Sequence, residues 1–133
     1  MFELDPTLAR DTAELARWSL CRVLLMNDSN YPWLVLVPQR PGLRDFDEVA
    51  GADRGVFDGE ITRACTVLRK MFKPHKLNVA SLGNVSPQLH VHVIARQTTD
   101  AAWPKPVWGV VPAKPYTPEA LASFRERFTA ATG

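Results

Sequence analysis

The stretch SPQLHVHVIAR, residues 86–96, places two histidines two positions apart in an otherwise apolar run. In an extended strand alternate side chains point to opposite faces, so Gln88, His90 and His92 share one face. The other face then carries apolar side chains only: Leu89, Val91 and Val93. Histidines two positions apart on a strand lie about 6–7 Å from each other, so one phosphate group can contact both. The pattern predicts a strand with one core face and one functional face.

Three other segments also have the composition of β-strands. LCRVLLM (20–26) and WLVLVP (33–38) flank the turn-forming segment NDSNYP (27–32), which predicts a hairpin with a longer loop. LNVASLGN (77–84) precedes the histidine stretch and predicts a second strand pair with it. Strand pairs joined by short connections favour an antiparallel sheet.

One long amphipathic helix is expected between the two strand pairs. Apolar residues recur at every third or fourth position from about Val49 to Phe72, and Pro74 ends the helix. With the strands, this order predicts an α+β fold, in which an antiparallel sheet carries the long helix on one face and is followed by a C-terminal helix. A chain of 133 residues has room for one core, so we expect a single domain over residues 1–133.

The two ends of the chain carry weaker signals. Residues 5–17 predict a short helix or turn that begins at Asp5 and Pro6. The segment 102–118 is rich in proline and tryptophan and predicts an irregular arm. Thr117 and Pro118 predict the start of the C-terminal helix, whose apolar stripe is formed by Leu121, Phe124 and Phe128.

Charge and composition restrict the class of protein. Sixteen Lys and Arg residues against 14 Asp and Glu residues give a formal net charge of +2, without a basic block. No nucleic-acid partner is expected from this balance. The N-terminus lacks the apolar core of a signal peptide, and no stretch is long and apolar enough for a membrane span, so we expect a cytoplasmic protein. Cys21 and Cys65 lack a CxxC spacing and are expected to be buried, reduced thiols.

Two chemistries suit histidines two apart on a strand, beside a purely structural role. Neutral imidazoles can ligate zinc, but a third ligand is needed, and His75 is the only other histidine. Alternatively, a neutral imidazole nitrogen attacks phosphorus while neighbouring donors stabilise the charge on the other phosphate oxygens. We expect the second chemistry, with no metal and no cofactor.

The turn before the histidines has residues that suit phosphate binding. Gly83 permits close backbone approach, and Asn84 and Ser86 add side-chain donors to the backbone N–H groups of the bend. The same residue types also dominate ordinary turns, which is the alternative explanation for this segment. Its position directly before His90 favours phosphate binding.

These residues resemble the signature of the histidine triad (HIT) superfamily of nucleotide hydrolases and transferases, H-φ-H-φ-H-φ-φ, where φ is apolar. Residues 88–94 read QLHVHVI, so the second and third histidines and all four apolar positions match, while Gln88 replaces the first histidine. The order of hairpin, long helix, strand, glycine turn, histidine strand and Trp-Pro arm is similar over most of the chain. The resemblance implies a HIT-like homodimer that binds a nucleoside phosphate, with a purine nucleotide expected.

The resemblance also implies roles for particular residues. His90 matches the nucleophile and His92 a phosphate contact, while the Gln88 amide can hydrogen-bond but cannot carry a proton's charge. The turn residues Gly83, Asn84, Val85 and Ser86 match the segment that holds the α-phosphate, and Asn78 resembles a polar residue that reaches toward it. Asn27 resembles the ribose contact, with Asp28 as the alternative if the register shifts by one; Asn27 is equally explained as a turn residue. Trp33, Trp103 and Trp108 are candidates for base stacking or for core packing.

The implied activity is transfer or hydrolysis at the α-phosphate of a dinucleoside polyphosphate or a nucleoside phosphoramidate, through a nucleotidyl-histidine intermediate on His90. The glutamine leaves a second hypothesis open, a nucleotide-binding protein with weak or no catalysis. A protein-interaction module that only keeps the fold is the third. Neither the base nor the leaving group follows from the sequence.

Overall fold

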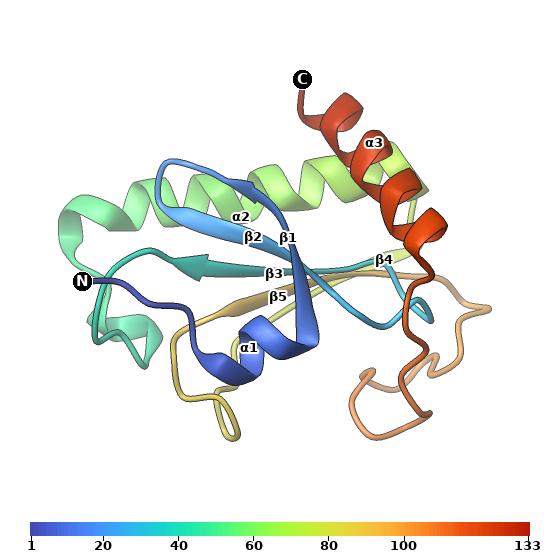
Figure 1. Cartoon of the computed structure of the whole chain (residues 1–133), viewed down its shortest axis with the longest axis horizontal. Coiled ribbons are helices and arrows are strands. Elements are labelled where there is room, and N and C mark those ends of the chain that lie inside the picture. Colours follow the sequence, from blue (N-terminus) through green and yellow to red (C-terminus); the bar gives the residue numbers. More distant parts are fainter.

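A computed structural model describes residues 1–133, and its five strands form one antiparallel sheet in the order β1-β2-β3-β5-β4 (Figure 1). The strands are β1 (Thr12–Arg17), β2 (Cys21–Met26), β3 (Trp33–Pro38), β4 (Lys76–Ala80) and β5 (Val91–Arg96). The helices are α1 (Pro6–Asp11), α2 (Gly51–Phe72) and α3 (Pro118–Thr132), with a short 3-10 helix η1 (Phe46–Glu48). The predicted α+β class is confirmed.

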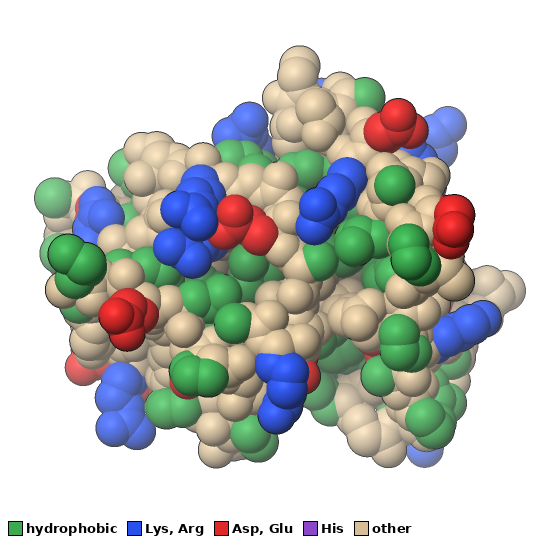
Figure 2. Space-filling view, in the orientation of Figure 1, with side chains coloured by type: hydrophobic (Ala, Val, Ile, Leu, Met, Phe, Trp, Pro, Cys, Tyr) green, Lys and Arg blue, Asp and Glu red, His purple; other side chains and the backbone are tan.

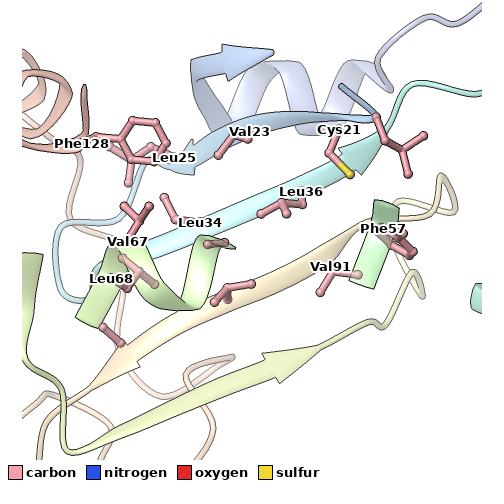
Figure 3. Close-up of a cluster of buried hydrophobic side chains, with 14 of the residues drawn as sticks. Cys21, Val23, Leu25, Leu34, Leu36, Phe57, Val67, Leu68, Val91 and Phe128 are labelled. Atoms are coloured by element: carbon pink, nitrogen blue, oxygen red, sulfur yellow. The ribbon is translucent and has the colours of Figure 1, made fainter. Parts of the chain in front are cut away.

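The long helix α2 and the C-terminal helix α3 cover one face of the sheet (Figures 1 and 3). Alternation along the strands decides which side chains face these helices, and Val91 and Val93 do so as predicted. They pack with residues of the neighbouring strand and of both helices: Leu34, Leu36, Phe57, Leu68, Phe124 and Phe128. The apolar face of the histidine stretch is therefore the face of the main core.

A second, smaller core lies on the opposite face of the sheet, beneath α1 and the arm that follows β5. Leu8 of α1 and Ala102 and Val107 of the arm pack against apolar side chains of the central strands: Trp33, Val35, Val37 and Ile94. Figure 1 shows α1 and the arm on the side of the sheet away from α2. Because this is also the face of His92, α1 and the arm build the walls around the histidines.

The predicted helix ends agree closely with the structure. Helix α2 begins at Gly51, two residues after the expected start, and Val49 is instead buried in the main core. It ends at Phe72 because Lys73 adopts a left-handed backbone conformation, with a φ of 48°, before Pro74. Helix α3 begins after Thr117, whose hydroxyl accepts a hydrogen bond from the Ala120 N–H over 3.1 Å.

The N-terminal prediction is wrong in its second half. Residues 6–11 form α1, with the Asp5 carboxylate accepting hydrogen bonds from the Thr7 and Leu8 N–H groups. Residues 12–17 form strand β1 instead of a helix, because β2 offers an open edge whose backbone pairs with them from Thr12 to Arg17. Leu15 and Ala16 still pack against the main core, so their apolar spacing reflects one face of a strand with a register shift.

The two cysteines are free, as expected; Cys21 is buried and Cys65 half-buried. Burial and the neighbouring Glu60 carboxylate raise the pKa of the Cys21 thiol. Glu60 itself is buried on α2 and accepts hydrogen bonds from the backbone N–H groups of Leu20 and Cys21, which fixes the start of β2 against the helix.

Basic and acidic side chains are interspersed on the face of the molecule shown in Figure 2, where no histidine is visible. This distribution agrees with the dispersed charges of the sequence.

None of the helices has the length and apolar character that crossing a membrane requires.

Candidate active site

The two histidines lie side by side and are almost completely buried. His92 lies within β5 and His90 directly precedes it, and their exposed fractions are 4% and 5%. The ring centroids are 4.8 Å apart, with the planes at 77°. This spacing is short enough for both imidazoles to contact one phosphate group.

His90 is oriented by the backbone two residues before it. Its Nδ1 lies 2.6 Å from the carbonyl oxygen of Gln88. A carbonyl oxygen only accepts hydrogen bonds, so Nδ1 carries a proton, and in the neutral imidazole Nε2 then keeps its lone pair. The arrangement leaves His90 with an unprotonated nitrogen available for attack, held by a backbone carbonyl.

His92 is held by an aromatic neighbour on β3. The indole Nε1 of Trp33 donates a hydrogen bond to Nδ1 of His92 over 2.9 Å. Trp108 of the arm packs edge-on against the same imidazole, with ring centroids 5.0 Å apart. Burial and the neighbouring His90 lower the pKa of His92 from its ordinary 6.5 to about 3. His92 is therefore uncharged at neutral pH.

A cavity of about 390 Å³ opens over the pair. Its walls are the turn at 82–86, helix α1 and Trp108, and its lining includes both histidines. Gly83 has a φ of +84°, a left-handed conformation that favours glycine, so this residue shapes the turn. Ser86 is buried in the lining, and its hydroxyl has no partner that meets the geometry of a hydrogen bond. Gly83, Asn84, Val85 and Ser86 thus all lie at the cavity, where the sequence placed the phosphate.

A second cavity of about 310 Å³ lies beside the first and shares Asp11 and Met26 with it. Asn27 and Asp28 both line this second cavity. The arm occupies part of their hydrogen-bonding capacity, because Asn27 accepts from the backbone N–H of Tyr116 and Asp28 from that of Lys114. Asn27 is exposed while Asp28 is buried, so Asn27 is the better placed of the two for a ligand.

Gln88 does not line the cavity with the histidines. Its Oε1 accepts from the Asp5 N–H and its Nε2 donates to the Glu3 carbonyl oxygen, both over 2.8 Å. The expectation that Gln88 joins a phosphate-facing row is wrong, because regular strand pairing begins only at Val91 and the side chain turns to the N-terminal segment. The contribution of Gln88 to the site is its backbone carbonyl oxygen, which accepts the hydrogen bond from Nδ1 of His90.

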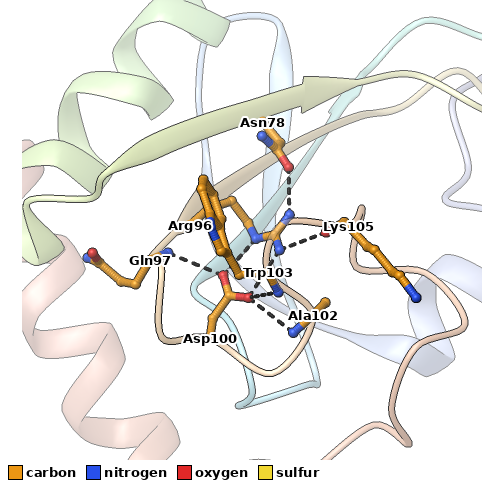
Figure 4. A network of polar contacts seen from close by, with 7 residues as sticks. All are labelled: Asn78, Arg96, Gln97, Asp100, Ala102, Trp103 and Lys105. Atoms are coloured by element: carbon orange, nitrogen blue, oxygen red, sulfur yellow. Dashed lines mark hydrogen bonds and ion pairs between the residues drawn. The ribbon is translucent and has the colours of Figure 1, made fainter.

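Asn78 is likewise held elsewhere. It lies on the histidine face of β4, but its Oδ1 accepts a hydrogen bond from Arg96 over 2.8 Å and it does not line the cavity. Arg96 is 1% exposed and also pairs with Asp100 at 2.7 Å and with the Lys105 carbonyl oxygen (Figure 4). The guanidinium holds the Asn78 amide toward the arm, away from the cavity where the phosphate is expected.

The Arg96 network fixes the arm on the sheet. Asp100 accepts hydrogen bonds from the backbone N–H groups of Gln97, Ala102 and Trp103 in addition to Arg96 (Figure 4). Burial raises the pKa of Asp100, but these hydrogen bonds outweigh it and hold the pKa below 3.8. Trp103 packs over Arg96 and His75, whereas Trp108 reaches the cavity.

Sequence reasoning missed the contribution of α1. Thr7, Leu8 and Asp11 line the cavity, although Asp5 and Pro6 indicated only that a helix begins there. The hydrogen bond from Trp33 to His92 was also missed, since a sheet register is needed to find it. No group of three or more His, Cys, Asp or Glu side chains is arranged to hold a metal ion.

The fold and the site define an α+β protein with a buried histidine pair under a glycine-containing turn. The family model described as "HIT domain" matches residues 10–99, and the chain belongs to this family. Membership supports a nucleotide-binding hydrolase or transferase in general terms. No curated protein sequence matches the chain significantly.

Solved structures agree over nearly the whole chain. The histidine triad protein blr8122 from Bradyrhizobium japonicum is 39% identical, with a TM-score of 0.96, and the match covers 99% of this chain and 98% of that one. The histidine triad protein SMc02904 from Sinorhizobium meliloti is 39% identical, with a TM-score of 0.95 and coverage of 98% and 96%. A histidine triad protein from Marinobacter aquaeolei is 42% identical, with a TM-score of 0.90 and coverage of 99% and 96%.

Proposed function

We propose that this protein binds a nucleoside phosphate derivative, with a purine nucleotide expected. It transfers the nucleotidyl group through a covalent nucleotidyl-histidine intermediate on His90. The observation that supports this most directly is the hydrogen bond between Nδ1 of His90 and the Gln88 carbonyl. It leaves the lone pair on Nε2 of a buried imidazole in a cavity with hydrogen-bond donors around it. The substrate class is the dinucleoside polyphosphates and nucleoside phosphoramidates.

In the first step the lone pair of His90 Nε2 forms a bond to the α-phosphorus, and the bond from phosphorus to the leaving group breaks. The leaving group departs with that electron pair, and an amine leaving group also takes up a proton from solvent. His92, the Ser86 hydroxyl and the N–H groups of the turn hydrogen-bond the non-bridging oxygens as charge develops. Water then attacks the same phosphorus and gives up a proton to solvent, the N–P bond breaks with its electron pair returning to Nε2, and the nucleoside monophosphate is released. None of these steps uses a metal or a cofactor.

The second cavity suits the nucleoside. Asn27 has one amide oxygen engaged by Tyr116, so its Nδ2 group remains to donate to a ribose hydroxyl. The two cavities share Asp11 and Met26, so one ligand can extend from the histidines to Asn27. We assign the phosphate to the first cavity and the ribose to the second on this basis.

We also propose a homodimer, as the family resemblance implies. Strand β4 is at one edge of the sheet, paired only with β5, and Val79 on it is 51% exposed. An unpaired edge with an apolar side chain offers a second copy both backbone hydrogen bonds and apolar contact. Light scattering of the wild type and of Val79→Lys tests this: a dimer that the substitution weakens supports the proposal, and a monomeric wild type contradicts it.

The test of activity compares the wild type with His90→Ala. With a dinucleoside polyphosphate and a nucleoside phosphoramidate as substrates, His90→Ala is expected to lower turnover by about 10³-fold or more, while AMP still binds in calorimetry. Mass spectrometry after acid-free quenching should show a nucleotidyl adduct on His90 of the wild type. His75→Ala is the matched control, because His75 is exposed and packs against Trp103 away from the cavity.

The possible results separate the hypotheses. Binding of AMP without turnover or adduct would favour a nucleotide-binding protein that has lost catalysis. Absence of AMP binding would favour an interaction module that keeps only the fold. Either result contradicts the proposed reaction.

A further inference from the structure

We propose that Trp33 is a positioning residue that holds His92 in one tautomer, with the proton on Nε2 and the lone pair on Nδ1. His92 would then act on the substrate only as an uncharged hydrogen-bond donor. The role in catalysis rests on the proposed function, whereas the tautomer itself can be measured without any substrate.

The assignment follows from the chemistry of the two rings. The indole Nε1 of Trp33 lies 2.9 Å from Nδ1 of His92. An indole N–H is a donor and never an acceptor, so Nδ1 must supply the lone pair. In a neutral imidazole the proton is then on Nε2, the nitrogen left free to meet a ligand in the cavity.

The sheet and its aromatic neighbours keep the two rings in place. Val35 of β3 pairs with His92 of β5, so Trp33, two residues before Val35, lies on the same face and diagonally opposite His92. Trp33 is 6% exposed and packs edge-on against Tyr31 and Trp108, with centroids 6.3 and 5.6 Å away. Trp108 also packs against His92. A rotation of either ring would have to displace this cluster.

Protonation of His92 is opposed by the same contact. A proton on Nδ1 would place two N–H donors against each other in a buried position and leave both without an acceptor in this contact. The lowered pKa of His92, caused by burial and by His90, agrees with this. The other titratable groups that line the cavity are His90 and Asp11.

The result is a complementary pair of imidazoles. The Gln88 carbonyl places the proton of His90 on Nδ1, and the Trp33 indole places the proton of His92 on Nε2. At the phosphate, one ring therefore offers a lone pair and the other an N–H group. His92 cannot compete with His90 as the nucleophile, and it can stabilise the charge of the non-bridging oxygens.

Long-range ¹H–¹⁵N NMR of the histidine side chains tests the tautomer directly. In the wild type, His92 is expected to show a single Nε2–H tautomer with no titration from about pH 8 to about pH 5, the range in which an ordinary histidine gains its charge. Trp33→Phe keeps an aromatic ring and removes the donor, so we expect a mixture of tautomers. Trp108→Phe is the matched control: it alters a ring that packs on His92 without a hydrogen bond to it, and the tautomer should persist.

Several results would overturn the proposal. A proton on Nδ1 of His92 in the wild type would do so even if no variant folds. An unchanged tautomer in folded Trp33→Phe would also contradict it. In the activity assay Trp33→Phe should lower turnover by about tenfold, the size expected for one misdirected hydrogen bond. If the NMR result holds but the wild type turns nothing over, the tautomer assignment stands and only the proposed reaction fails.

Discussion

Gln88 accepts a hydrogen bond from the backbone N–H of Asp5, 83 residues earlier in the chain, over 2.8 Å. Its amide nitrogen donates to the Glu3 carbonyl in turn. The residue at the first motif position thus ties the N-terminal segment to the histidine stretch. Since the next residues of that segment form α1, which lines the cavity, Gln88 stabilises a wall of the cavity without lining it.

Replacing Gln88 with histidine tests whether this position has a chemical role. We expect Gln88→His to leave turnover unchanged or lower, because the side chain at this position points to residues 3–5. Gln88→Ala should lower the free energy of unfolding by about 1–2 kcal/mol through loss of two hydrogen bonds. Steady-state kinetics and urea unfolding provide the measurements. A rise in turnover of about 10²-fold in Gln88→His would show that the missing histidine limits the chemistry.

Local patterning was enough to predict β2, β3 and α2, because α2 has a helical period of apolar residues and β2 and β3 are apolar runs that contribute side chains to both cores. It failed for residues 12–17, where an open edge of the sheet decided between strand and helix. The edge is formed by a different segment, so no signal within 12–17 could indicate it.

The site shows the same division between local and distant effects. His90, His92 and the turn at 83–86 are close in sequence, and alternation plus the family pattern brought them together correctly. Gln88 and Asn78 were misplaced because their partners, Asp5 and Arg96, lie far along the chain. The orientation of a side-chain amide is set by the donors and acceptors within its reach. Strand alternation does not predict which of these partners it will bind.

The stability of the protein should fall in mild acid because of His92. Its pKa is about 3 in the folded protein and near 6.5 in the unfolded chain, so between these values the unfolded state binds more protons. The free energy of unfolding then falls as the pH falls, by about 1.5 kcal/mol from pH 6.5 to about pH 5 for this group alone. Urea unfolding of the wild type and of His92→Asn at both pH values isolates the effect. An equal acid dependence in the two proteins would rule out His92 as its source.

Loss of the Asp100 carboxylate should destabilise the arm and the site together. Asp100→Ala leaves the buried Arg96 without its ionic partner, which is expected to cost about 3–5 kcal/mol, and frees three backbone N–H groups. Because the arm carries Trp108 into the cavity, AMP affinity should fall as well. Glu14→Gln, in an exposed ion pair with Arg17, serves as the control and should cost less than about 1 kcal/mol. Similar losses in both variants would contradict a special role for the buried pair.

The site should favour substrates whose leaving group departs without a proton. Gln88 lies outside the cavity and His92 is uncharged at neutral pH, so neither position supplies a histidine acid. A polyphosphate leaves as a stable anion, whereas an alkylamine must be protonated as its bond to phosphorus breaks. General acid catalysis is worth about 10²- to 10⁴-fold, so turnover of an alkyl phosphoramidate should be slower than that of a dinucleoside polyphosphate by about 10²-fold or more. The comparison uses kcat values for the two substrates with the same nucleoside. Phosphoramidates with aryl amines of decreasing basicity should recover the rate progressively. Equal rates across that series would contradict this preference.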